Sequence, residues 1–149
     1  MIVGATTIAV LLVALAVVAG FDDVFGVYCD SGGTAISVRE EVTGTARAQL
    51  ETTLAGAVTN QQEDVAFTVA AIKGILITVS GNATATVVLK TNSTGSPDNT
   101  LTFPIGGGEM VWSNRSPATC PITAAVTTTY WTHAGSETVT IKLRALYNS

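Results

Sequence analysis

The stretch ETVTIKLRAL, residues 137–146, alternates apolar and polar side chains along its whole length. A two-residue period places every second side chain on the same side of an extended strand. We therefore predict a β-strand with an apolar face turned to a core and a polar face turned to solvent. The apolar face consists of Val139, Ile141, Leu143 and Ala145, and the polar face of Thr138, Thr140, Lys142 and Arg144.

Working outward from this stretch, the same pattern predicts short strands along most of the chain. Residues 61–71 alternate, with Val65, Phe67 and Val69 on one side, and the apolar residues 72–80 predict a core strand. Residues 45–55 are the one stretch with helical propensity, although the context also allows a strand. Further strands are predicted at residues 34–43, 83–91, 100–103, 109–112 and 122–132, the last with Ile122, Ala124 and Val126 inside and Tyr130 as a further inward candidate.

Turn residues separate these segments. The cluster Asp30-Ser31-Gly32-Gly33 predicts a hairpin, residues 92–99 form the strongest loop signal, and Gly106-Gly107-Gly108 predicts a tight turn followed by a strand. Strands that recur at intervals of about 8–12 residues are typical of an all-β sandwich or barrel. The sequence therefore predicts an all-β, β-sandwich or jelly-roll-like domain over residues 24–149.

Residues 1–22 form a hydrophobic segment before this domain, and residues 1–20 read MIVGATTIAVLLVALAVVAG without a charged side chain. About 20 apolar residues suffice to span a bilayer as a helix, so a membrane anchor is one interpretation. A secretory signal peptide fits less well because no Lys or Arg precedes the apolar run. The third interpretation is a helix or strand buried in an oligomer, as in pilin filaments, and the Val, Ile and Thr content leaves helix and strand open.

The composition indicates that the chain buries more surface than a monomer can. Hydrophobic residues make up 47% and charged residues 12% of the chain, against roughly 25% charged residues in a typical domain. The mean hydropathy is +0.44, so a partner, an oligomer or a membrane must cover apolar surface. The net charge is −4 and the seven Lys and Arg residues are scattered, so we expect no nucleic-acid partner.

We predict no catalytic, cofactor-binding or metal-binding residues, and hence no enzyme. His133 is the only histidine and precedes a turn, where a structural role is the commoner one. Adjacent acid pairs such as Glu40-Glu41 point to opposite faces of a strand, so they form poor catalytic dyads. Calcium binding through Asp98 and Asn99 lacks the spacing of a known calcium loop, and one His with two Cys cannot complete a zinc site.

A few residues remain candidates for covalent or surface roles. Cys29 and Cys120 are the only cysteines, and a disulfide between them and two free thiols are equally open. Three N-x-S/T sequons fall in predicted loops, so glycosylation is open there. Aromatic residues near strand ends either cap the core, anchor a subunit interface or line a sugar site, and the first two are favoured. The sequons start at Asn82, Asn92 and Asn114, and the aromatic interface candidates are Trp112, Tyr130 and Trp131.

Four pieces lie in order over roughly the last two-thirds of the chain: VTGTAR (42–47), TNQQ (59–62), LKTNSTGSPDNTL (89–101), and MVW (110–112) leading to a final LRAL (143–146). In these pieces the chain resembles small virion proteins of tailed bacteriophages that are encoded near the major capsid gene. The resemblance implies a compact β-sandwich that decorates or cements a capsid, or joins a head to a tail, with no active site. The apolar residues 1–20 depart from this class, whose members usually begin with an ordinary strand.

The sequence thus predicts a structural subunit of a virion, a capsid decoration or cement protein of a phage. Its expected partners are copies of itself and a major structural protein, and its expected location is the virion. The alternatives are a pilin-like extracellular filament subunit and a membrane-anchored surface protein, both of which use residues 1–20. A carbohydrate-binding or enzymatic β-domain is the third hypothesis, with His133 as its best candidate residue.

Overall fold

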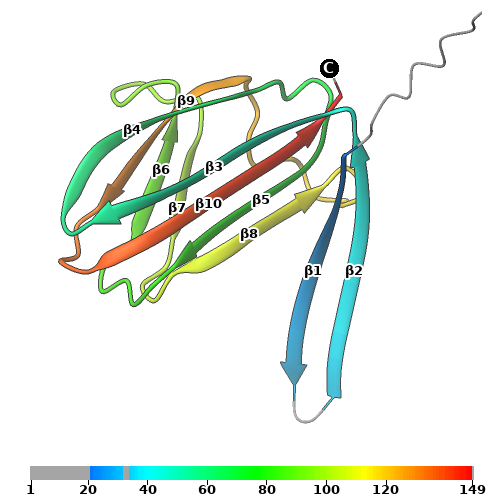
Figure 1. Ribbon diagram of the computed structural model, residues 1–149, viewed down its shortest axis with the longest axis horizontal. Coiled ribbons are helices and arrows are strands. Elements are labelled where there is room, and N and C mark those ends of the chain that lie inside the picture. The colour runs from blue at the N-terminus through cyan, green and yellow to red at the C-terminus, as the bar shows by residue number, and fades with distance from the viewer. Residues whose placement is uncertain (1–20, 32–33, 149) are drawn as a thin grey trace, which may run out of the picture.

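The computed structural model describes the backbone of residues 21–31 and 34–148 and the side chains from Val42 onward. Over these residues the chain has no helix and forms a hairpin and two four-stranded antiparallel sheets that pack against each other (Figure 1). This confirms the predicted all-β fold with a β-sandwich. The strands are β1 (Phe21–Ser31), β2 (Thr34–Gly44), β3 (Ala46–Ala55), β4 (Val58–Phe67), β5 (Ile72–Ser80), β6 (Val87–Thr91), β7 (Thr100–Phe103), β8 (Gly108–Ser113), β9 (Val126–His133) and β10 (Thr138–Tyr147).

The front sheet of Figure 1 has the order β3-β10-β5-β8, and the back sheet has the order β4-β9-β6-β7. Strand β10 lies in the middle of the front sheet, where Leu143 is paired with Leu50 of β3 and Ile77 of β5. The four residues predicted for its apolar face are all buried in the core between the sheets. On the back sheet, Trp131 fills the core and its ring centroid lies 6.5 Å from that of Phe103.

Most predicted strands are confirmed, and β5 has the predicted bounds. The helix-prone residues 45–55 instead form β3, because Ala46 to Ala55 pair with β10 along its whole length. Ten residues of ladder hydrogen bonding and a shared core outweigh a weak intrinsic preference. Strands β6 and β9 begin four residues later than predicted. Before β6, the carbonyl of Ala83 instead accepts a hydrogen bond of 2.7 Å from the backbone N–H of Gly106, in the loop between β7 and β8.

The inward face of β9 differs from the prediction at one position. Val126 is buried as predicted, but the next inward residues are Thr129, Trp131 and His133, and Tyr130 points outward. The cause is a register shift opposite β4, where Asp64 pairs with Thr128 but Phe67 pairs with Val126. A bulge of this kind changes which residues of the shorter strand face the core.

The predicted turns are present. Residues 92–99 contain no strand, and Gly106 and Gly107 have φ values of 88° and 89°, which only glycine adopts at little cost. The predicted hairpin around residues 30–33 joins β1 to β2, with Ser31 paired to Thr34. Strands β1 and β2 pair only with each other, so the sandwich itself begins at Ala46 rather than at residue 24. The period of a strand does not say which sheet it joins.

The hairpin of β1 and β2, called the arm below, projects away from the two sheets (Figure 1). Its closed end is formed by Ser31 and Thr34, and its base by Phe21 and Gly44, next to the start of β3. Residues 1–20 precede this base and lie outside the described residues. The membrane, filament and buried-segment interpretations concern these residues, so they stay predictions. Within the described part of the chain, no helix is long and apolar enough to cross a bilayer.

Candidate functional site: the arm and its seat

The arm is a long two-stranded ribbon with two unpaired edges. Its eleven residue pairs run without a bulge from Phe21 and Gly44 to Ser31 and Thr34. Neither strand pairs with a strand of the front or back sheet. Each arm strand therefore has one row of backbone N–H and C=O groups that no described strand of this chain satisfies, which is the arrangement that accepts a further strand.

The base of the arm is seated on the outer face of the front sheet. Val42 of β2 is 3% exposed and packs against Leu146 of β10, which is fully buried. The half-buried Leu76 and Val111 complete this small apolar cluster, which we call the seat. Leu76 pairs with Val111 across β5 and β8, so the seat spans three neighbouring strands of the front sheet.

A glycine permits the close approach of the arm to the sheet. A Cβ atom at Gly44 would lie 2.8 Å from the carbonyl oxygen of Tyr147 and 2.9 Å from Cγ of Leu146. Contacts this short are not found for real side chains, so any larger residue would push β2 away from β10. Gly44 and Val42 together fix where the arm leaves the sandwich.

The three aromatic candidates have different positions. The prediction that Trp131 contributes to an interface is wrong, because its side chain is fully buried and its indole N–H donates to Thr129 Oγ1 at 3.0 Å. Trp112 on β8 is half-buried against the core and its indole N–H donates to the carbonyl of Ala118 at 2.8 Å. Tyr130 is half-buried on the outer face of β9, so an interface role for Trp112 and Tyr130 stays a prediction.

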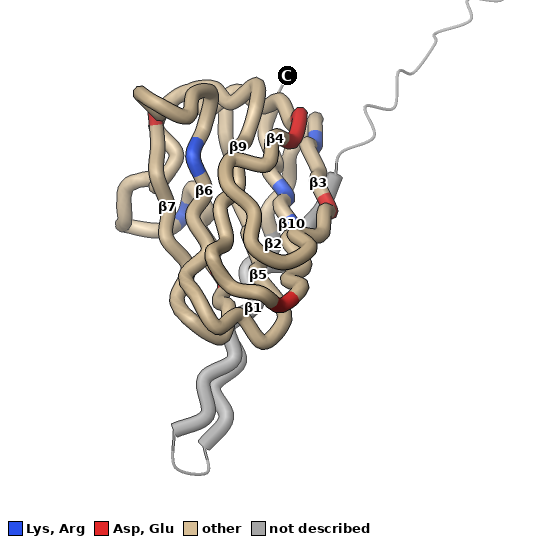
Figure 2. Tube along the Cα trace, turned by 90° about the vertical axis from the view of Figure 1, so that its left-hand side faces the viewer, with Lys and Arg blue, Asp and Glu red and all other residues tan. Residues whose placement is uncertain are grey.

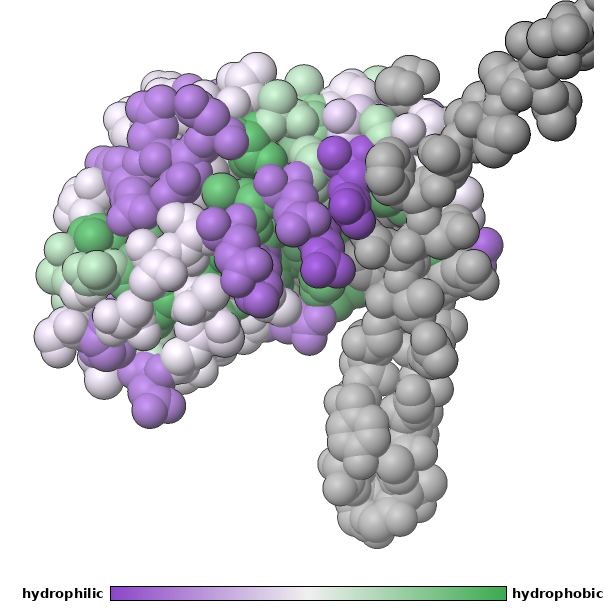
Figure 3. All heavy atoms as spheres, viewed as in Figure 1, coloured by the Kyte–Doolittle hydropathy of each residue, from purple (hydrophilic) through white to green (hydrophobic). Residues whose placement is uncertain are grey.

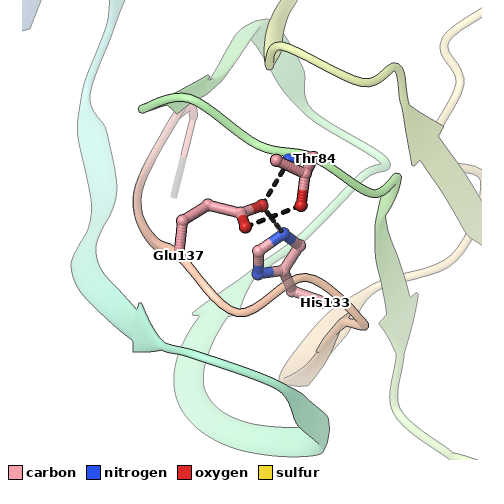
Figure 4. Close-up of polar contacts among 3 residues, drawn as sticks. All are labelled: Thr84, His133 and Glu137. Carbon is pink, nitrogen blue, oxygen red and sulfur yellow. Dashed lines mark hydrogen bonds and ion pairs between the residues drawn. The ribbon is translucent and has the colours of Figure 1, made fainter.

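The only histidine is part of a polar cluster at one end of the sandwich (Figure 4). His133 is fully buried, and its Nε2 lies 2.9 Å from Oε1 of Glu137. That contact has the distance of an ion pair but not the angle of a hydrogen bond, and Nδ1 has no partner. Glu137 also accepts hydrogen bonds from the backbone N–H and the hydroxyl of Thr84, the latter at 2.7 Å.

This cluster ties the β9–β10 turn to the segment before β6. The Thr84 hydroxyl and N–H groups are the main reason that the pKa of Glu137 falls from its ordinary value of 4.5 to about 2, with a smaller contribution from His133. A Cβ at Gly135 would lie 2.6 Å from Nε2 of His133, so glycine leaves the space that the pair needs. The Glu137 carboxylate therefore links the β9–β10 turn to the segment before β6 through its hydrogen bonds to Thr84.

Two further predictions concern covalent chemistry. Cys120 has a free thiol in a half-buried position, and burial raises its pKa. The side chain of Cys29 lies outside the described residues, but Cys120 forms no disulfide in this structure, so of the two alternatives the free thiol is the one found at Cys120. Of the three sequon asparagines, Asn92 is hydrogen-bonded through its side chain: its two Nδ2–H groups donate to the Ala125 carbonyl and to the Asp98 carboxylate. Asn82 and Asn114 are exposed. A glycan at Asn92 would remove one of these hydrogen bonds.

Among the residues from Val42 to Asn148, no pocket opens and no three His, Cys, Asp or Glu side chains converge as a metal site requires. Asp98 and Asn99, the calcium candidates, are engaged with different partners, Asn92 and Thr123. No family model, curated protein or solved structure matches the chain. The resemblance to phage virion proteins therefore stays a prediction, and the arm, its seat and the sheet faces are the features from which a function can be argued.

Proposed function

We propose that this chain is a non-enzymatic structural subunit of a phage particle, a capsid decoration or cement protein that acts by packing against neighbouring subunits. Its partners are copies of itself and a major structural protein of the particle. The stabilisation comes from protein–protein contact, so the role requires a stable sandwich and a means of reaching a neighbour.

The arm is the observation that carries this proposal. It extends over eleven residue pairs outside both sheets and pairs only with itself. An isolated two-stranded hairpin is marginally stable in water, and a third strand or a covering surface is needed to hold it. A neighbouring subunit that adds a strand to the arm, or packs on one side of it, would supply what the chain itself does not.

The seat supports the same proposal. Val42 and Leu146 bury the base of the arm against the front sheet, and Gly44 holds β2 close to β10. Because the base of the arm is fixed on the front sheet, a neighbouring subunit that binds the arm is also held in a fixed position relative to the sandwich. A flexible tether would not join two subunits rigidly, whereas a seated arm does.

The composition agrees with a subunit that is covered in its assembly. Only 12% of the residues are charged and the mean hydropathy is +0.44. Large obligate interfaces are apolar and resemble a domain core cut in two. A subunit that works within a lattice of this kind has less need of charged surface than a monomer has.

A filament subunit is the second candidate, and residues 1–20 favour it. Twenty uncharged, mostly apolar residues are followed directly by the arm. In a filament such segments bundle in a dry centre, and in a surface protein the same segment enters a bilayer. In either case the sandwich is displayed outward, and the arm makes the lateral contact.

Deleting residues 1–20 separates these candidates. A decoration subunit without these residues still folds and still co-sediments with the particle, whereas a filament subunit folds but no longer polymerises. Val42→Asp tests the arm, because a buried carboxylate at the seat displaces it while the main core is untouched. Thr53→Asp is the control for the added carboxylate, since Thr53 is exposed on β3 of the front sheet, outside the seat. The proposal predicts that only Val42→Asp abolishes co-sedimentation, and equal binding by both variants would contradict it.

A further inference from the structure

The outer face of the back sheet, called the back face below, has almost no charge. Its strands alternate, so the residues between the buried ones point outward. Among those on β4, β9, β6 and β7, only Asp64 and Lys90 are charged, and Figure 2 shows few coloured residues on these strands. The outward residues include Gln62, Asp64 and Ala66 of β4, Thr128, Tyr130 and Thr132 of β9, Val88 and Lys90 of β6, and Thr100 and Thr102 of β7.

The front sheet differs. Its outer face has charged residues on three strands, and Lys142 of β10 forms an ion pair of 3.1 Å with Glu51 of β3. Figure 3, seen from this side, shows strongly hydrophilic side chains over the middle of the face. Mixed charges of this kind keep a surface soluble, whereas a low share of charged residues around a central tyrosine is a feature of the centre of an interface.

The two charges of the back face lie on opposite sides of its central strand. Tyr130 of β9 is paired with Gln62 on one side and with Lys90 on the other. Asp64 lies one row further along, where it is paired with Thr128 of β9. A positive and a negative group therefore flank the centre of the face diagonally, with Tyr130 and Thr128 between them.

We propose that the back face packs against the same face of a second copy of this chain. The two-fold axis lies in the plane between the two faces, crosses β9 between Tyr130 and Thr128, and runs perpendicular to the line that joins Lys90 to Asp64. In that arrangement Lys90 of each copy meets Asp64 of the partner subunit. The inference rests on the proposed structural role, and it names the surface through which copies join.

A second copy is the occupant that the charge pattern favours. A two-fold interface uses the same patch on both subunits, so the patch must be complementary to itself. One lysine and one aspartate placed diagonally about the centre satisfy this condition, whereas a face of one charge would not. Lys90 Nζ donates to the Thr94 carbonyl at 2.8 Å and keeps two further N–H groups for a partner. Asp64 is exposed and accepts a hydrogen bond from Gln62 at 3.3 Å through one of its two carboxylate oxygens.

Cross-linking of the full chain tests the position of the axis. Thr128→Cys places a thiol next to the proposed axis, so two copies should form a disulfide across it under mild oxidation. Thr78→Cys is the matched control, because Thr78 is also a half-buried threonine in mid-strand, but on the outer face of the front sheet. The unmodified chain gives the background from Cys29 and Cys120. We expect a disulfide-linked dimer on a non-reducing gel for Thr128→Cys at several times the yield of Thr78→Cys.

Charge exchange tests the partner contact. Lys90→Asp leaves two aspartates on each face, and Asp64→Lys leaves two lysines, so each variant alone should associate at least about tenfold more weakly than the unmodified chain. An equimolar mixture of the two variants should recover association, because every contact then joins opposite charges. Glu109→Lys, on the other sheet, is the control and should associate normally. Association is measured by analytical ultracentrifugation of the full chain.

Recovery in the mixture together with the Thr128 cross-link supports the proposal. If particles still assemble but neither the cross-link nor the charge dependence is found, the back face is not the joint, and the proposed structural role survives. If the chain stays monomeric at all concentrations and binds no particle, both proposals fail. If the same variants instead remove binding to a different macromolecule, the second copy is the wrong occupant.

Discussion

Replacing Leu146 with alanine removes the residue on which the arm is seated. Leu146 is fully buried, but its neighbours are Val42 and the half-buried Leu76 and Val111 rather than the main core. Leu143, three positions earlier on the same strand, is buried on the opposite side, between the two sheets. Leu143→Ala is therefore a matched control: the same strand and the same substitution, but a different cluster.

The size of each effect follows from the number of atoms removed and from how well the site can collapse. Leu→Ala deletes three carbons, which at about 0.8 kcal/mol each gives a transfer loss of about 2.4 kcal/mol. The seat is small and its rim is half-exposed, so little cavity remains and we expect about 2–3 kcal/mol for Leu146→Ala. The core around Leu143 cannot collapse in this way, and a residual cavity brings the expected loss to about 3–5 kcal/mol.

Two measurements on each variant check this prediction. Urea unfolding gives the free energy of unfolding, and limited trypsin digestion reports on the arm through cleavage after Arg39 in β2. Unseating the arm should accelerate cleavage after Arg39 in Leu146→Ala while cleavage after Arg115, in an exposed loop, stays unchanged. In Leu143→Ala the stability falls further, without a selective change at Arg39.

If Leu146→Ala is as costly as Leu143→Ala and cleavage after Arg39 does not change, the seat is part of the main core and does not hold the arm. A loss below about 0.5 kcal/mol would also contradict the account, because that is the range of ordinary surface substitutions.

Three further predictions follow from other parts of the molecule. The lowered pKa of Glu137 contributes stability that is present above pH 4.5 and is lost as the pH falls toward about 2. In Glu137→Gln the free energy of unfolding should therefore depend less on pH over this range than in the unmodified chain. An unchanged pH dependence would show that the hydrogen bonds from Thr84 to the carboxylate contribute no stability. Gly107→Ala places a Cβ against the Val79 carbonyl at a positive φ, so the free energy of unfolding should fall by about 1–3 kcal/mol and the melting temperature by several degrees. An unchanged melting temperature would contradict the geometry of this turn. Burial raises the pKa of Cys120, so alkylation of its peptide at pH 8, followed by mass spectrometry, should be slower in the native chain than in urea, and equal rates would refute it.

The fold could be predicted where hydrophobic period and burial agree. Strand β10 alternates cleanly because one of its faces meets the core, and β5 is apolar because it lies inside the front sheet. Residues 45–55 have a mixed pattern, and pairing with β10 rather than local preference makes them a strand. Which residues of β9 face the core could not be predicted, because the register shift between Asp64 and Phe67 arises from the pairing of β4 with β9 and not from either sequence alone.

The candidate site was less accessible to sequence reasoning than the fold. The turn at residues 30–33 predicts a hairpin, but nothing in the pattern indicates that β1 and β2 join neither sheet. Leu146 follows Ala145, so alternation places it on the outer face, but only the structure shows that Val42 of the arm covers it there. One signal was present in the sequence: two adjacent apolar residues, Ala145 and Leu146, break the alternation, as a strand buried on both faces does.

Electron microscopy of native particles that contain this chain tests the central claim most directly. We expect a β-sandwich at regular positions on a capsid or tail lattice, with the arm of Phe21–Gly44 in contact with a neighbouring subunit. An axial bundle of the N-terminal segments, surrounded by outward-facing sandwiches, would instead establish a filament and contradict the virion role. An isolated sandwich whose arm touches no other chain would contradict the claim that the arm is the means of assembly.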